Sequence, residues 1–308
     1  MPLDHALPKH RPYRNSGAIF QIGLKPMDPE RWLDTGPDHA AFMAMKRERL
    51  KGRPPLFYRS IPESFDAQSE LLNAVTAQVL KCHGAQFKMD GGHLIDLVDG
   101  SRHDLADTSL EPLEIVGNAL EEDFILFQKR AGQDIITAAS NAYTSSGRIV
   151  SCVGRDMRYA HDPVPGLNEQ LAARIDRVLA NIQKGAPVVR FNWFITAISS
   201  RLFPQGWHEA NVSASEQVAR SLHEDHRLAG ELLWLRVERQ TFLRLPETEA
   251  LAFGIHTYSD QLSSISNDRE SLEAMHRLLG EYSKDRLNYS AMLATRAPVL
   301  RWIEDKLA

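Results

Sequence analysis

One strand-like segment, Leu233–Pro246, carries charged side chains on a face that should be buried. Leu235 and Val237 follow the alternation of a core-facing strand, and the same parity places Arg239 and Thr241 on that face. An inward-facing arginine requires an anionic partner, because an unpaired buried charge costs several kcal/mol. That partner is either a carboxylate of the protein or an anion of a bound cofactor, unless the strand has a different register.

A histidine is expected on a rigid, proline-rich loop just before a long helix. His161 precedes Pro163 and Pro165, and the two prolines force a stiff, extended backbone. A rigidly placed imidazole suits an axial metal ligand or a general acid or base. The same loop also suits a sharp reversal of the chain, in which case the histidine is only structural.

Two further groups are candidates for lining a pocket. Glu121, Glu122 and Asp123 stand together before an apolar run. Three adjacent carboxylates are typical of a solvated turn, but one that points inward would have a raised pKa or bind an ammonium group. Arg190 and Asn192 share one face of another strand, where they serve either a ligand or the protein's own hydrogen bonds.

Composition and missing motifs exclude several classes of protein. The 308 residues carry a net charge of −4 without a basic stripe, so we expect no nucleic acid partner. Neither an apolar stretch of about 20 residues nor a signal peptide is found, so we expect a cytoplasmic protein that does not enter membranes. Cys82 and Cys152 are the only cysteines and fit small buried side chains in a reducing compartment. Motifs for phosphate loops, dinucleotide binding, zinc hydrolysis and serine hydrolysis are absent.

Hydrophobic periodicity predicts the elements that position these residues. Helices are expected at 37–49, from about 66 to 83, at 113–120 and at 167–182, with two or three more at the end of the chain. Strands are expected at 93–98, 123–127 and 188–196, in a long hairpin of 233–245 with 251–257, and more weakly at 135–139 and 148–153. Strands in the middle with helices around them favour an α+β fold. We expect an N-terminal arm over residues 1–25, either mobile or draped over the body, and one domain over 26–308 with a C-terminal helical segment.

The block LRVERQTFLRLP, from Leu235 to Pro246, is followed by FGIHTY, from Phe253 to Tyr258. Weaker segments precede them in the same order: RWL at 31–33, PLEIVGNALEEDFILF at 112–127, HDPVPG at 161–166 and VVRFNWFI at 188–195. Together these segments resemble the haem-dependent oxidative N-demethylase-like family, from roughly residue 32 to residue 262. The resemblance implies a PAS-like antiparallel sheet whose flanking helices enclose a haem b pocket.

The same resemblance implies an activity and partners. Members of the family remove a methyl group from a small secondary amine with O2, and a separate flavin and iron–sulfur reductase supplies the electrons. His161 would be the axial ligand of the iron, while Arg239 and Arg190 would pair with the propionates.

Further residues would line this pocket by the same resemblance: Thr241, Asn192, Glu238 and Tyr258. Glu122 or Asp123 would hold the protonated amine or relay protons to bound oxygen. The haem performs the oxidation, and the protein supplies the ligand, the orientation and the protons.

The chain departs from the family at two places. Gly147–Gly154 stands where a Trp and a Lys are usual, and His256 stands where an Arg is usual. His256 is therefore a rival ligand of the iron, and Cys152 is a third. These departures keep two alternatives open: a non-catalytic haem sensor of gas or redox state, and a protein that has lost haem.

Overall fold

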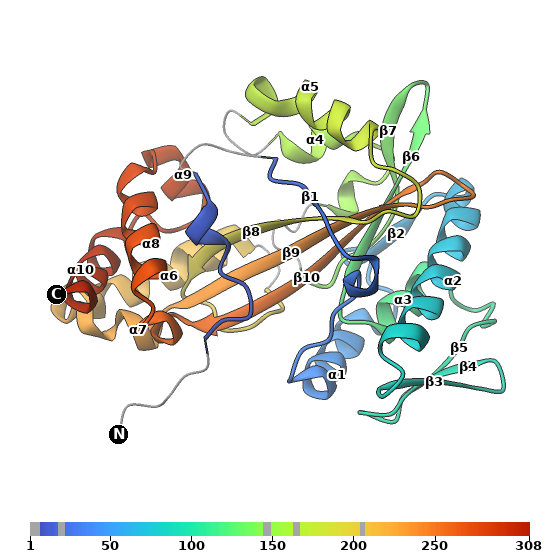
Figure 1. The fold of residues 1–308 in the computed structure, drawn as a ribbon, viewed down its shortest axis with the longest axis horizontal. Helices are drawn as coiled ribbons and strands as arrows, with labels where there is room; N and C mark the ends of the chain where they lie inside the picture. Colours follow the sequence, from blue (N-terminus) through green and yellow to red (C-terminus); the bar gives the residue numbers. More distant parts are fainter. Residues whose placement is uncertain (1–6, 18–21, 144–148, 163–166, 204–206) are drawn as a thin grey trace.

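The computed structural model describes residues 7–17, 22–143, 149–162, 167–203 and 207–308. Within these residues, a seven-stranded antiparallel sheet crosses the middle of the molecule and helices cover both of its faces (Figure 1). The strands stand in the order β1-β8-β9-β10-β6-β7-β2. This arrangement confirms the expected mixed fold, in which strands gather between helices.

The strands of this sheet are β1 (Lys25–Pro26), β2 (Tyr58–Ser60), β6 (Asp123–Arg130), β7 (Gln133–Ser140), β8 (Val188–Thr196), β9 (Trp234–Arg244) and β10 (Leu251–Gln261). A small second sheet contains β3 (Phe87–Asp90), β4 (His93–Asp96) and β5 (Arg102–Asp104). The helices are α1 (His39–Leu50), α2 (Phe65–Cys82), α3 (Pro112–Ala119), α4 (Met157–His161), α5 (Leu167–Ala180), α6 (Trp207–Glu224), α7 (Ala229–Leu232), α8 (Arg269–Glu281), α9 (Lys284–Tyr289) and α10 (Arg296–Leu307).

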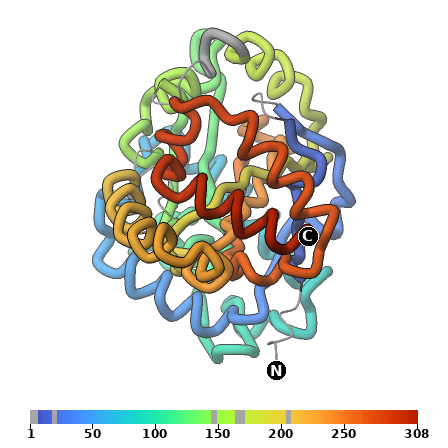
Figure 2. Tube along the Cα trace, turned by 90° about the vertical axis from the view of Figure 1, so that its left-hand side faces the viewer, coloured from blue at the N-terminus to red at the C-terminus, as the bar shows by residue number. Residues whose placement is uncertain are grey.

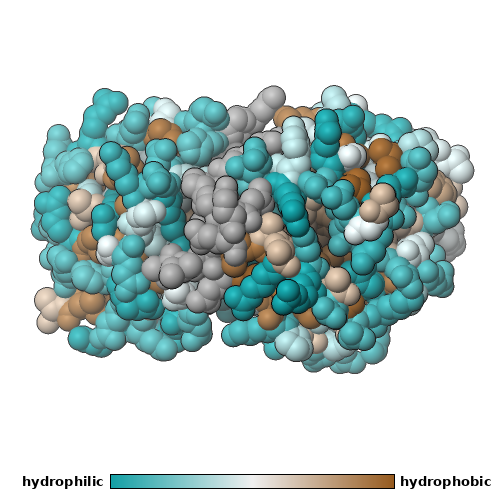
Figure 3. Space-filling model, turned by 90° about the horizontal axis from the view of Figure 1, so that it is seen from above, coloured by the Kyte–Doolittle hydropathy of each residue, from teal (hydrophilic) through white to brown (hydrophobic). Residues whose placement is uncertain are grey.

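Each face of the sheet has its own core. On one face, Ile125, Phe242 and Ile255 pack with Ile175 and Leu179 of α5, and we call this the α5 face. On the other side, which we call the α2 face, the cluster contains Phe124, Leu243 and Ala252 of the sheet together with apolar residues of α2 and α3. Figure 1 shows α4 and α5 on one side of the strands and α2 and α3 on the other. Seen from the α4 and α5 side, the surface is mostly hydrophilic with scattered apolar side chains (Figure 3).

The register of the central strands decides which polar side chains meet. Asn192 of β8 lies opposite Glu238 of β9, and Glu238 lies opposite Thr257 of β10. Directly opposed residues share a face, whereas successive residues of one strand alternate between faces. Glu238 therefore belongs to the α5 face, and its neighbour Arg239 belongs to the α2 face.

The C-terminal helices cover one end of the sheet, where α8 and α10 pack together (Figure 2). Tyr13, in the 3-10 helix Pro12–Asn15, is fully buried in the apolar cluster of these helices. Arg11 and Arg14 both form ion pairs with Asp268 at the start of α8. The described part of the expected N-terminal arm is therefore draped over the body. Among the described residues, no helix is both long enough and apolar enough to cross a membrane.

Most expected elements are present, but the prediction of a strand at 148–153 is wrong. Val150–Cys152 forms a 3-10 helix whose apolar side chains are buried on the α5 face. Short apolar runs do not distinguish a strand from a buried helical turn, which explains the error. The long helix α6 was not predicted, and the strand expected at 93–98 ends at Asp96.

Candidate functional site

Four polar side chains form a block on the α5 face of the central strands. Arg190 and Asn192 come from β8, and Glu238 and Gln240 come from β9. The register pairs Arg190 with Gln240 and Asn192 with Glu238, so the four side chains share one face and adjoin each other. The sequence-predicted pair of Arg190 and Asn192 thus meets a carboxylate there.

Glu238 is a buried carboxylate with one oxygen left over. Its Oε2 accepts hydrogen bonds from Gln240 Nε2 at 3.0 Å and from Asn192 Nδ2 at 3.4 Å. Its Oε1 has no hydrogen-bond partner, and Arg236 Nε lies 3.8 Å away. Burial raises the pKa of the Tyr289 hydroxyl to about 12, and the charge of Glu238 nearby contributes. Because Oε1 has no hydrogen-bond partner, a ligand atom that donates a hydrogen bond to it would complete the hydrogen bonding of this carboxylate.

The guanidinium of Arg190 has a buried N–H group without a hydrogen-bond partner. Its Nε is buried and unbonded, and no carboxylate of the described chain lies within 4.0 Å of its guanidinium. Burial lowers the pKa of Arg190, and the charge of Glu238 only partly opposes this. The site therefore holds a cation whose charge the neighbouring described side chains do not fully offset.

His161 lies close to this cation. It ends the short helix α4, whose start is capped by the Asp156 carboxylate accepting from Tyr159 N at 2.9 Å. The expectation of a loop position for His161 is therefore wrong, and the prolines at 163 and 165 lie outside the described residues. Burial and the charge of Arg190 lower the pKa of His161 to about 4, so the imidazole is neutral at physiological pH. A neutral imidazole has a lone pair available for a metal.

Arg239, by contrast, lies on the α2 face and is only 5% exposed. Its guanidinium donates to the backbone oxygens of Trp32, at 3.1 Å, and of Arg31. No described carboxylate lies within 4.0 Å of it, so the expected internal salt bridge is not found among the described residues. Thr241 shares this face, opposite Gly254, and its hydroxyl oxygen is buried without a hydrogen-bond partner. The structure therefore does not bring Arg239 and Thr241 together with His161.

Tyr258 and Glu122 also belong to the α2 side. The Tyr258 hydroxyl donates to the Asp34 carboxylate, and Asp34 N donates to Glu122 Oε1 at 2.8 Å. His256 lies between two carboxylates, with Nδ1 3.4 Å from Glu122 Oε1 and Nε2 3.5 Å from Glu121 Oε2. Protein side chains thus flank both nitrogens of the rival ligand His256.

The three adjacent carboxylates are all buried, so the interpretation as a solvated turn is wrong. Asp123 pairs with Lys46 Nζ at 3.1 Å and accepts from Tyr143 N at 2.7 Å. Burial raises the pKa of Asp123, while Lys46 opposes the shift. Glu121 accepts from His39 Nδ1 at 2.8 Å and pairs with Arg201. The chain itself therefore supplies the partners of these acids.

Within the described part of the chain, one group of ligand-type side chains is close enough for a metal ion: His39, Asp96 and Asp99. However, His39 already uses both nitrogens, with Asp96 Oδ2 at 2.5 Å and Glu121 at 2.8 Å. The group is therefore explained as a buried ion-pair chain. Cys152, the third candidate ligand, is buried in the apolar cluster of the α5 face.

Sequence reasoning missed two residues that complete the α5-face block. Gln240 fixes Glu238, and Arg236 is fully buried beside it. Both stand two positions from Glu238, so the strand alternation already marked them as residues of the same face.

A family model described as haem-dependent oxidative N-demethylase, alpha subunit-like, matches residues 23–300. The chain belongs to this family. The match spans every strand of the seven-stranded sheet as well as His161, Arg190 and Glu238. The family's name specifies haem dependence and an oxidative reaction, so the unpartnered Arg190 and the neutral His161 become the first place to seek the haem.

Proposed function

We propose that this chain binds haem b on the α5 face of its sheet and removes a methyl group from a small secondary amine with O2. The topology supports a PAS-like sheet for this purpose. Taken in chain order, β6, β7, β8, β9 and β10 occupy the spatial order β7-β6-β10-β9-β8, which is 2-1-5-4-3. The helices α4 and α5 lie between the second and third of these strands and pack on the same face as Glu238.

The observation that carries the proposal is the proximity of Arg190, whose charge lowers the pKa of the imidazole, to His161. Haem presents propionate anions and an iron that takes a neutral imidazole. Arg190 has a buried, unbonded Nε and no carboxylate of the described chain within 4.0 Å, and His161 is held neutral near it. Charge-assisted hydrogen bonds from a guanidinium to a carboxylate would resolve the unpaired cation. We therefore assign the iron to His161 and a propionate to Arg190.

Glu238 is the residue we assign to the amine. A small secondary amine is protonated at neutral pH, so it carries a positive charge and two N–H donors. The Oε1 of Glu238, which has no hydrogen-bond partner and only a long ion pair with Arg236 at 3.8 Å, can accept one of these donors, while Asn192 and Gln240 hold the other oxygen in place. The arrangement fixes the nitrogen and provides a base that can remove its proton.

The remaining predicted residues have no direct role in this proposal. Asp123 pairs with Lys46, and Glu122 accepts a hydrogen bond from Asp34 N, so the chain itself already provides partners for both carboxylates. Thr241 and Tyr258 lie on the α2 face with Arg239. We therefore exclude these residues from contact with the amine, contrary to the resemblance-based expectation.

The reaction requires electrons from outside this chain. Oxidation of dimethylamine consumes one O2, two electrons and two protons, and it yields methylamine, formaldehyde and water. Haem supplies oxygen activation when bound. Two cysteines that stand 70 positions apart cannot supply the four thiolates of an iron–sulfur cluster. We therefore propose a separate flavin and iron–sulfur protein as the electron donor.

The experiment starts from purified protein reconstituted with haem. A Soret band in the visible spectrum, followed by formaldehyde formation from dimethylamine in air with an artificial reductant, is the expected result. Absence of a Soret band after reconstitution would contradict haem binding. A Soret band without formaldehyde from any of a panel of small amines would instead support the non-catalytic haem sensor.

A further inference from the structure

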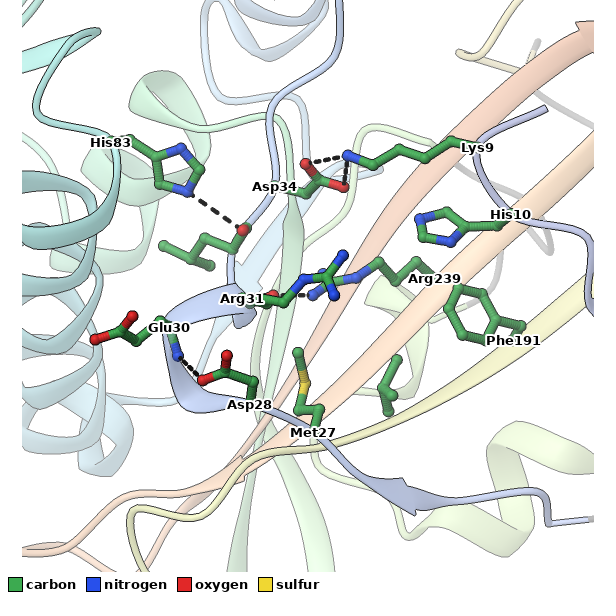
Figure 4. A pocket seen from close by; sticks show the side chains of 12 residues that line it. Lys9, His10, Met27, Asp28, Glu30, Arg31, Asp34, His83, Phe191 and Arg239 are labelled. Carbon is green, nitrogen blue, oxygen red and sulfur yellow. Dashed lines mark hydrogen bonds and ion pairs between the residues drawn. The ribbon is translucent and has the colours of Figure 1, made fainter. Parts of the chain in front are cut away.

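A cavity opens on the α2 face, on the other side of the sheet from His161 and Glu238. Its volume is about 470 Å³, and it lies between the N-terminal segment and strands β8 and β9 (Figure 4). Met27, Val189 and Phe191 give it apolar walls, while Arg31 and Arg239 bring charge. The proposed reaction uses none of these residues.

The cavity lining carries three cationic side chains, Lys9, Arg31 and Arg239, and three carboxylates, Asp28, Glu30 and Asp34, which are only partly paired with each other. Lys9 Nζ pairs with Asp34 at 2.5 Å, and Glu30 at the rim pairs with Lys81 at 3.0 Å. The Asp28 carboxylate accepts a hydrogen bond from Glu30 N. Among the described residues, neither Arg31 nor Arg239 has a carboxylate within 4.0 Å. Two guanidinium groups thus line one cavity without an ion-pair partner.

These two arginines are close to each other. Arg239 donates to the backbone oxygen of Arg31, and Figure 4 shows both guanidinium groups in the cavity. Arg239 is 5% exposed and has only neutral carbonyl partners, so water screens its charge poorly. An anion placed between the two groups would offset both charges, and a guanidinium binds carboxylate and phosphate through two parallel hydrogen bonds.

A neutral histidine completes the lining. Burial lowers the pKa of His10 to about 4, and its Nε2 is buried without a hydrogen-bond partner. The imidazole lies 4.8 Å from the Phe191 ring, between centroids. Apolar and aromatic walls with a few aimed polar groups are typical of a site for a small organic molecule.

We propose that this cavity binds a small organic anion, with a carboxylate or phosphate held by Arg31 and Arg239 and an apolar body against Phe191 and Met27. The site is separate from the proposed haem site, because Arg239 and Glu238 occupy opposite faces. The proposal therefore does not depend on the chemistry of the α5 face.

The test measures binding to the haem-reconstituted protein by calorimetry with three probes: inorganic phosphate, phenyl phosphate and benzoate. We expect at least one organic probe to bind at least tenfold more tightly than inorganic phosphate. Phenyl phosphate and benzoate distinguish a phosphate from a carboxylate site. Tighter binding of inorganic phosphate than of both organic probes, or no binding of any probe, would overturn the proposal.

Variants locate the binding. Arg31→Gln changes an exposed side chain and should weaken the organic probe at least tenfold, as should Arg239→Lys. Arg102→Gln, an exposed arginine paired with Asp90 on the small sheet, is the matched control and should leave binding unchanged. Unchanged binding in Arg31→Gln overturns the proposal even if Arg239→Lys fails to fold. Loss of the Soret band in Arg239→Lys with unchanged probe binding would assign Arg239 to the haem and also overturn it.

Discussion

Glu238 and Arg239 are neighbours in β9, yet their side chains belong to opposite faces of the sheet and to different sites. Glu238 meets Asn192 and Gln240 on the α5 face, whereas Arg239 meets the backbone of Arg31 and Trp32 on the α2 face. The block Leu235–Pro246, which carries most of the resemblance to the family, therefore contributes side chains to both faces of the sheet. Variants at these adjacent positions should have different consequences.

Arg190→Ala should weaken haem retention, whereas Arg239→Ala should not. Loss of a charge-assisted hydrogen bond costs about 1.5–3 kcal/mol, which corresponds to a roughly 10- to 100-fold higher dissociation constant. Transfer of haem to apomyoglobin, followed in the Soret region, measures this. Arg190→Lys keeps the charge without the forked geometry and should be intermediate. Equal retention in Arg190→Ala and the wild type would argue against a propionate at Arg190.

His161→Ala should prevent stable haem incorporation or shift the ferric spectrum strongly, because iron would lose its proposed imidazole ligand. The visible spectrum after reconstitution measures this directly. His223→Ala, at an exposed position of α6, is the control and should keep the native spectrum. A native spectrum in His161→Ala would move the assignment to His256.

Glu238→Gln should preserve the fold and the haem spectrum but lower the rate of formaldehyde formation by about 10²–10⁴-fold, the usual contribution of a general base. The amide keeps the shape of the side chain but cannot accept the proton of the amine. Glu122→Gln, on the other side of the sheet, should retain haem-dependent activity. Full activity in Glu238→Gln would remove Glu238 from the proposed mechanism.

The sequence predicts the grouping of residues within one strand, but not the contacts between residues that are far apart along the chain. Alternation within a strand correctly grouped Arg190 with Asn192 and Arg239 with Thr241. The register between β8 and β9 is not visible in the sequence, and it places Asn192 opposite Glu238. For that reason the prediction merged residues of two faces into one pocket.

Long-range partners explain the other errors. The carboxylate of Glu121 is buried because His39 and Arg201, about 80 positions away on either side, supply cations. No local pattern announces such partners, so a run of three acids was expected to be solvated. The helical position of His161 did have a local signal, since Asp156 is a good N-cap residue.

The effects of substitutions at Lys46 and Asp123 on the free energy of unfolding should be strongly coupled. Lys46 is fully buried, donates to the backbone oxygens of Leu120, Glu121 and Glu122, and pairs with Asp123. Removing one partner of a buried ion pair costs about 3–5 kcal/mol, because the other charge stays buried and uncompensated. Urea unfolding of Lys46→Met, Asp123→Asn and the double variant measures the coupling. A double variant whose loss equals the sum of the single losses would contradict it.

Asp268 should make the N-terminal segment sensitive to acid. Burial alone would raise the pKa of this carboxyl, but hydrogen bonds from Arg14, Ser271 and Arg11 outweigh it and hold the pKa below the ordinary 3.8. A carboxyl whose folded pKa is depressed stabilises the fold above its unfolded pKa. That contribution is lost as the pH falls from 3.8 through the folded value.

Asp268→Asn should therefore lower the free energy of unfolding at pH 7 by about 1–3 kcal/mol, since it weakens two ion pairs and an N-cap. The difference between wild type and variant should shrink below pH 3.8, because the Asp268 carboxylate of the wild type becomes protonated, while the other acids titrate in both proteins and cancel. Urea unfolding between pH 7 and pH 3 measures the difference. Hydrogen exchange at residues 7–17 should accelerate in the variant. Asp285→Asn, at an exposed position of α9, is the control, and a difference that does not change with pH would contradict the role assigned to the Asp268 carboxylate.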